Sequence, residues 1–398
     1  MTLDRRATWP FAALSAAYFA HVGLFHPFFP LWLSASGYGL GAIGLLVSAQ
    51  AATRLFAPYV WGWLGDRSGS HLQWLRWGAL AALVSSLGLL FPLGLWGLLL
   101  VLLLLFLHTS ALMPTSETLL AEHVTARSGA MDLKRYGHIR LWGSAGFLAT
   151  VLWGGAWFEQ AGLSSFPLVV VATLVAVAAA AWCVRAGPNP PAAPATRGGA
   201  RVGTVLRQAP VRWFFASLFF HVWAHTLLYG FFSLRLAELG YSRTVIGACW
   251  ALAVVCEIAW FVVQGRWLGR WSLPNWLVLA AAVTAVRMAL VAEWAHVWPV
   301  LLLAQALHAI TFAAHHTACV ALISAHFPGA MRGRGQALYT MVGYGVPGVL
   351  GGLMGGWLGG HWGLSAVFWA AAGAALAATG CTLRLRAVAP PAPRASGG

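Results

Sequence analysis

Five charged residues stand inside long apolar segments of this chain, where a charge is costly and is therefore expected to have a function. They are Arg54, Glu117, Arg140, Glu257 and Arg287. A carboxylate in such a place can take up and release a proton, and an arginine can bind an anion or tune a neighbouring acid. We expect Glu117 to lie near Arg140 and Glu257 to lie near Arg287. A structural ion pair between helices is the alternative in each case.

Histidines fall in the same apolar segments: His21, His26, His221, His225, His308, His315 and His316. The pair His221 and His225 and the adjacent His315 and His316 resemble fragments of membrane di-iron sites, but a third histidine box is absent. We therefore predict no metal, and a histidine-rich membrane metalloenzyme stays as the alternative of another class. Otherwise these histidines line a wet cavity or bond across helices.

The segments that position these residues belong in a membrane. Of the 398 residues 60% are hydrophobic and only 8% are charged, with a formal net charge of +15. A soluble domain carries roughly a quarter charged residues, so a soluble enzyme, a secreted disulfide scaffold and a disordered tail are excluded. The positive charge alone suggests nucleic acid, but basic residues gathered at one membrane face explain it without a nucleic-acid partner.

One membrane span needs about 20 mainly apolar residues, and the chain has room for twelve. We expect spans at 10–34, 39–63, 75–95, 97–121, 138–158, 164–185, 211–236, 244–264, 275–293, 296–325, 335–358 and 362–383. The predicted domains are an N-terminal six-helix bundle 1–185, a cytoplasmic linker 186–210, a C-terminal six-helix bundle 211–386 and a flexible cytoplasmic tail 387–398. With the N-terminus inside, most of the 24 lysines and arginines lie on the inner side, which predicts two cytoplasmic termini.

The two halves repeat each other. A shift of 203 positions superposes Gly37 and Tyr38 on Gly240 and Tyr241, and Ile43 and Gly44 on Ile246 and Gly247, without a gap. The same shift places Arg54 on Glu257, so equivalent positions carry opposite charges. Two parallel repeats of this kind place a substrate site near the membrane midplane, between the halves.

Glycines recur every four residues at 348, 352, 356 and 360, along the eleventh predicted span and just past its end. Small residues at this spacing form a smooth helix face that lets another helix approach closely. We expect a packing role for them.

The segment Gly62 to Gly69, with Asp66 and Arg67 in its middle, resembles the gating loop of the major facilitator superfamily. Ser70 and His71 stand where that loop usually ends in two basic residues, so its charge network is expected to be weaker or rewired. The resemblance implies an all-α integral membrane protein of the major facilitator fold. Its 12 transmembrane helices would form two pseudo-symmetric six-helix bundles, with Gly62, Asp66, Arg67 and Gly69 in the gating loop.

Four further motifs together resemble the phenylpropionate permease family of that superfamily. They are Tyr136 to Phe147, Leu239 to Glu257, Leu307 to His316, and Arg332 to Tyr339. The resemblance implies a transporter rather than an enzyme: a monomer in the bacterial inner membrane that takes up a small organic anion, such as 3-phenylpropionate, together with protons. It would need no cofactor, because the proton gradient drives it and the chain has no phosphate-binding Gly-x-x-x-x-Gly-Lys loop. An efflux antiporter and a sugar or nucleoside symporter are the alternatives on the same fold.

The charged residues are also similar in placement to those of the lactose permease family of sugar–proton symporters. That resemblance implies the proton-coupling candidates Glu257, His308 and His315, and Glu117 is a further candidate. The substrate-binding candidates are Arg140, Arg287, Arg54, Trp250 and His21.

Overall fold

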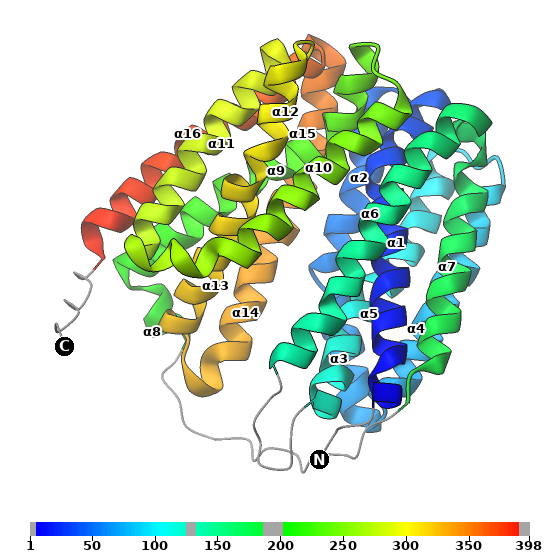
Figure 1. Cartoon of the computed structure of the whole chain (residues 1–398), viewed down its shortest axis with the longest axis horizontal. Coiled ribbons are helices and arrows are strands. Elements are labelled where there is room, and N and C mark those ends of the chain that lie inside the picture. The colour runs from blue at the N-terminus through cyan, green and yellow to red at the C-terminus, as the bar shows by residue number, and fades with distance from the viewer. Residues whose placement is uncertain (1–4, 125–132, 186–201, 390–398) are drawn as a thin grey trace. The chain divides into compact units, whose positions relative to one another are not determined.

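The computed structural model describes residues 5–124, 133–185 and 202–389, and the elements in these ranges are all helical (Figure 1). Helices satisfy every backbone N–H and C=O within their own segment, which lipid requires. The prediction of an all-α membrane protein is therefore confirmed.

The chain packs into two compact units. Unit 1 consists of Met1–Pro194, Tyr229–Ala251 and Gly352–Gly360, and unit 2 consists of Ala195–Leu228, Leu252–Gly351 and His361–Gly398. The predicted bundles 1–185 and 211–386 follow the sequence repeat, whereas two stretches of the second half pack in unit 1. The division into two six-helix bundles stays a prediction.

Seven helices and two 3₁₀ turns of the first half lie in unit 1. They are α1 (Arg5–Ala35), α2 (Leu40–Arg54), α3 (Ala57–Ser68), α4 (His71–Ser86), η1 (Leu87–Leu90), α5 (Leu95–Val124), α6 (Leu133–Ala161), η2 (Leu163–Ser165) and α7 (Phe166–Cys183). Helix α1 packs on α6 and α7, and α5 packs on α2 and α4. A core around Phe11, Leu75, Leu112 and Val177 joins α1, α4, α5 and α7.

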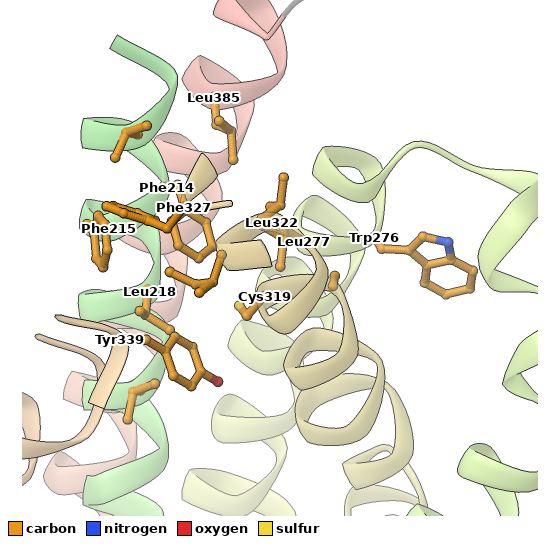
Figure 2. Packing of buried hydrophobic residues seen from close by; sticks show 14 of the residues in the cluster. Phe214, Phe215, Leu218, Trp276, Leu277, Cys319, Leu322, Phe327, Tyr339 and Leu385 are labelled. Atoms are coloured by element: carbon orange, nitrogen blue, oxygen red, sulfur yellow. The ribbon is translucent and has the colours of Figure 1, made fainter. Parts of the chain in front are cut away.

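The second half begins with α8 (Val202–Leu206), α9 (Ala209–Glu238) and α10 (Arg243–Val263). It continues with η3 (Gln264–Arg266), η4 (Leu268–Arg270), α11 (Leu273–Trp294), α12 (Trp298–Ala306), η5 (Ala309–Ala314), α13 (His315–His326), η6 (Gly329–Met331), α14 (Arg332–Thr340), η7 (Met341–Gly345), α15 (Val346–Trp362) and α16 (Leu364–Val388). In unit 2, α11 packs on α13 and α16. Figure 2 shows the core there, with Phe214, Phe327 and Leu385 close together. Lipid tails are as apolar as leucine, so close packing holds these helices together.

Within the described residues, nine helices are long and apolar enough to cross a membrane. The three other predicted spans coincide with α1, α4 together with η1, and α6. Large apolar side chains are open to the surroundings, among them Trp96 at 72% and Val262 at 79% exposure. Soluble proteins avoid such apolar surface, whereas lipid covers it. The chain is a multi-pass membrane protein, and the total of twelve spans stays a prediction.

Three predicted segments contain local structure that the prediction did not include. The span 39–63 matches one stretch, Leu40–Gly65, that is long and apolar enough to cross a membrane. Its helix is interrupted, because α2 ends at Arg54 and α3 begins at Ala57, with Pro58 in its first turn. The segment predicted as a gating loop is helical up to Ser68 and ends at Gly69, whose φ of 65° is the left-handed conformation that glycine supplies at a helix end. The last part of the predicted linker forms α8, while the rest of that linker and residues 390–398 of the tail lie outside the described residues.

The glycine face of α15 makes a close helix contact, as its spacing predicts. A Cβ placed on Gly44 of α2 would overlap the carbonyl oxygen of Gly352 and lie 2.8 Å from Cα of Gly356. The repeat-equivalent Gly247 of α10 is as close to α6, where a Cβ would lie 2.5 Å from the carbonyl oxygen of Val151. Gly360 has open space at its Cβ position, so the packing role is confirmed for Gly352 and Gly356 and not for Gly360.

Candidate functional site

A chain of polar side chains joins three helical segments in unit 2. Glu257 on α10 is 3.3 Å from Nε2 of His308, which directly precedes η5. Nδ1 of the same imidazole is 3.2 Å from Nη1 of Arg287 on α11. Arginine can only donate, so Nδ1 accepts and Nε2 of a neutral His308 carries the hydrogen that it donates to Glu257. The predicted neighbours Glu257 and Arg287 are thus linked through His308 rather than in direct contact.

Arg287 is held in place by several acceptors. Its Nε donates to the carbonyl oxygen of Ala304 over 2.6 Å, its Nη1 to Oγ1 of Thr311 over 3.1 Å, and its Nη2 to Oε1 of Gln305 over 3.5 Å. The residue is only 1% exposed. A buried arginine with this many acceptors is fixed in position, and it fixes the ring of His308 in turn.

The helix that carries His308 is irregular at this point. Residues Ala309–Ala314 form a π-helical turn, η5, and Nε2 of His221 on α9 donates to the carbonyl oxygen of Thr311 within it over 2.8 Å. π-Helical turns are rare and often occur at functional sites. Thr311 therefore connects His221 with Arg287 through its backbone and its side chain.

His315 lies apart from the acid. Its ring stacks on that of His221 with a centroid distance of 3.5 Å and an interplanar angle of 9°, and Sγ of Cys319 is 3.6 Å from its Nε2. His225 follows on α9, 4.7 Å from His221 between ring centroids. The structure places His315 in this histidine stack rather than beside Glu257, and its proton-coupling role stays a prediction.

Arg54, the repeat equivalent of Glu257, is the last residue of α2 in unit 1 and is half-buried. One turn earlier, Nε2 of Gln50 is 3.3 Å from Nε2 of His26 on α1. His21, also on α1, hydrogen-bonds through Nδ1 to Oγ1 of Thr173 over 3.0 Å. The candidates Arg54 and His21 therefore lie in unit 1, each with its own polar neighbours.

Glu117 on α5 and Arg140 on α6 form an ion pair, as their positions in the sequence predict. Their side chains are 38% and 40% exposed. Exposed ion pairs are screened by solvent and stabilise a protein little. The structure thus gives Glu117 and Arg140 a structural role as an ion pair. The proton-coupling role of Glu117 and the substrate-binding role of Arg140 stay predictions.

We expect the variants Glu117→Gln and Arg140→Gln to be only slightly less stable than the wild type. A thermodynamic cycle of the two single variants and the double variant, measured by thermal unfolding in detergent, should give a coupling energy below about 1 kcal/mol. If both single variants also keep full uptake, the pair is structural. A loss of uptake in a folded single variant that the double variant does not restore would contradict that role.

Trp250 on α10 donates from its indole N–H to Oγ of Ser233 over 3.0 Å, and its ring is 5.9 Å from that of Tyr229 on α9. In the predicted gating segment, the Arg67 guanidinium lies over the ring of Trp63 at 5.3 Å. The side chain of Asp66 lies outside the described residues. The gating role of Gly62, Asp66, Arg67 and Gly69 stays a prediction.

Comparison with known proteins decides the family. Residues 9–370 match the profile of the MFS_1 like family, which is nearly the whole chain. The chain belongs to this family. It is therefore a transport protein of the major facilitator type and not an enzyme, and the family implies a small-molecule substrate.

Two named transport proteins are similar to this transporter in sequence. The chain is 29% identical over 344 residues to a protein of Escherichia coli K12 named "Probable 3-phenylpropionic acid transporter", covering 82% of this chain and 85% of the relative. It is 30% identical over 339 residues to the maltose permease of Geobacillus stearothermophilus, covering 82% of this chain and 81% of the relative.

Solved structures agree on the fold. The nucleoside transporter NupG superposes with a TM-score of 0.77 at 15% identity, over 97% of this chain and 99% of that chain. A D-xylose–proton symporter superposes with a TM-score of 0.72 at 12% identity, over 96% and 97%. At such low identity the likeness extends to the major facilitator fold alone.

The sequence interpretation of this transporter missed Gln305, Thr311 and Gln50. Gln305 and Thr311 each lie three residues from His308, a spacing that places them on one helix face. Gln50 lies four residues before Arg54, a spacing that likewise places these two residues on one helix face. Helix spacing around the charged residues was thus a usable signal for all three.

Proposed function

We propose that this transporter takes up a small organic acid such as 3-phenylpropionate together with one proton, by alternating access. Glu257 and His308 form the proton site, Arg287 positions His308, and the proton gradient is the driving force without a cofactor. The protein acts as a monomer in a bacterial inner membrane, with both termini in the cytoplasm.

The observation that carries the proposal is the chain from Glu257 through His308 to Arg287 inside a membrane protein. When Glu257 is ionised, it accepts a hydrogen bond from His308, and a protonated Glu257 loses most of that attraction. Any conformational state that separates the two residues therefore has a different affinity for the proton. Such a difference is what a proton needs in order to shift the balance between states.

The substrate class is supported by the relative named "Probable 3-phenylpropionic acid transporter". The maltose permease supports a second candidate, a sugar–proton symporter. The two candidates differ in net charge: a monovalent carboxylate with one proton carries none, whereas a sugar with one proton carries one positive charge.

The test is uptake of labelled 3-phenylpropionate and of labelled maltose into proteoliposomes, with protein-free liposomes as the control for passive diffusion of the acid. We expect a pH difference of one unit, acid outside, to drive about tenfold accumulation of the carboxylate, abolished by an uncoupler. A membrane potential alone should drive none. Maltose uptake that responds to the potential, by roughly 2.3 kcal/mol per 100 mV, would instead establish the sugar symporter. Proton flux opposite to substrate flux would establish an antiporter.

A further inference from the structure

Four arginines within the predicted spans, Arg54, Arg140, Arg235 and Arg287, differ in what surrounds their charge. Arg287 is enclosed by acceptors, Arg140 pairs with Glu117, and Arg235 donates to Glu238 over 2.6 Å. Arg54 forms neither a hydrogen bond nor an ion pair through its guanidinium with any side chain that the structure describes. A cation within an apolar span normally has an acidic or carbonyl partner, so Arg54 is the exception that needs an explanation.

The neighbours of Arg54 are neutral. Its charge acts electrostatically on Tyr18 and His26 of α1. Gln50, one turn earlier on α2, is hydrogen-bonded to the same His26. All four residues are half-buried in the structure. The carbonyl ends of α2 attract a cation at Arg54, but partial charges offset only part of a full charge.

This set of groups is suited to an anion. The guanidinium offers planar paired donors that fit a carboxylate, the Tyr18 hydroxyl and the Gln50 amide can each donate as well, and no described acid competes for them. A neutral sugar would leave the positive charge uncompensated.

The sequence repeat relates Arg54 to an acidic residue in the second half. Arg54 and Glu257 occupy equivalent positions of the two halves, one at the end of α2 and one in α10. Glu257 has its partner in His308, while Arg54 has none among the described side chains. Equivalent positions have thus taken opposite charges, one suited to a proton and one suited to an anion.

We infer that Arg54 recognises the carboxylate of the transported organic anion, with Tyr18 and Gln50 as further donors. Arg287 does not contact the substrate and acts as a positioning residue for His308. The inference rests on the proposed function, and it narrows the substrate class to anions whose charge Arg54 neutralises.

The test compares 3-phenylpropionate with its neutral amide, 3-phenylpropanamide, in binding to the purified full-length protein. We use the wild type, Arg54→Gln, Arg54→Lys, and Arg207→Gln as a control for the loss of one positive charge at an exposed position outside the long helices. The wild type and the control should bind the acid more tightly than the amide by about 10- to 100-fold, as expected for charge-assisted hydrogen bonds. Arg54→Gln should lose that preference with its amide affinity unchanged, and Arg54→Lys should recover part of it.

The outcomes separate failure of the inference from failure of the proposed function. If the wild type prefers the acid and a folded Arg54→Gln keeps that preference, another residue binds the carboxylate and the inference is wrong. If the wild type binds maltose but neither the acid nor the amide, the proposed substrate itself is wrong. A fall in amide affinity equal to the fall in acid affinity would show that Arg54 supports the structure rather than the ligand charge.

Discussion

Replacing Glu257 with glutamine is expected to abolish accumulation of substrate against a gradient while exchange of substrate across the membrane continues. Glutamine keeps an oxygen that can accept the hydrogen bond from Nε2 of His308, 3.3 Å from the native carboxylate. It cannot take up a proton, so the states of the transporter no longer differ in proton affinity. Accumulation driven by a pH difference should fall to the level of protein-free liposomes, whereas exchange should stay within about threefold of the wild type.

The matched control is Glu238→Gln. Glu238 ends α9 and pairs with Arg235 three residues earlier, with 45% of its side chain exposed. Its loss removes an acid without touching the chain from Glu257 to Arg287, so accumulation should be normal. Uncoupler-sensitive accumulation by Glu257→Gln itself would place the proton site elsewhere, and loss of exchange together with accumulation would indicate a damaged fold.

Parts of this site followed from the sequence because they depend on local chemistry. A charge within an apolar run marks a candidate functional position whatever the detailed packing, and this reasoning selected Glu257, Arg287 and Arg54. The spans followed from apolar length, since lipid leaves the backbone no alternative to a helix there. The pairing of Glu117 with Arg140 was also predicted, and the structure confirms it.

The position of His315 could not be predicted from local chemistry in this way. In a regular helix of 3.6 residues per turn, His308 and His315 would lie on almost the same face, because seven residues make nearly two turns. The π-helical turn η5 lies between them and has more residues per turn, so it rotates His315 away from the face of His308. The residue types do not predict this turn. In the structure it is accompanied by a tertiary contact, the hydrogen bond from His221 to the carbonyl oxygen of Thr311.

A proline in the sequence marks the break between α2 and α3. Pro58 has no N–H to donate to the carbonyl oxygen of Arg54 four residues earlier, and proline is favoured in the first turn of a new helix. The structure begins α3 at Ala57, one residue before this proline, and Arg54 is the last residue of α2. Arg54 therefore lies in the middle of a span, as predicted, and also at the end of the first of the two helices in that span.

The glycine contact between α2 and α15 predicts the second large effect. A Cβ on Gly44 would overlap the carbonyl oxygen of Gly352 and lie 2.8 Å from Cα of Gly356, and backbone cannot move aside as the end of a side chain can. The repeat-equivalent Gly247 has the same relation to Val151 of α6. Two close contacts of the same kind lie at equivalent positions of the repeat, and we expect this packing to belong to one state of the proposed transport cycle.

Gly44→Leu is therefore expected to slow substrate exchange by about tenfold or more, because overpacking of about 1–3 kcal/mol disfavours the state that contains this contact. Exchange in proteoliposomes is the measurement, and thermal unfolding verifies that the variant is folded. The control is Gly41→Leu on the same helix, since the Cβ position of Gly41 has no heavy atom within 4 Å. That variant gains the same side chain and should exchange at the wild-type rate. Equal rates for both variants would mean that α2 and α15 need not approach this closely during transport, because leucine at position 44 leaves no room for the contact.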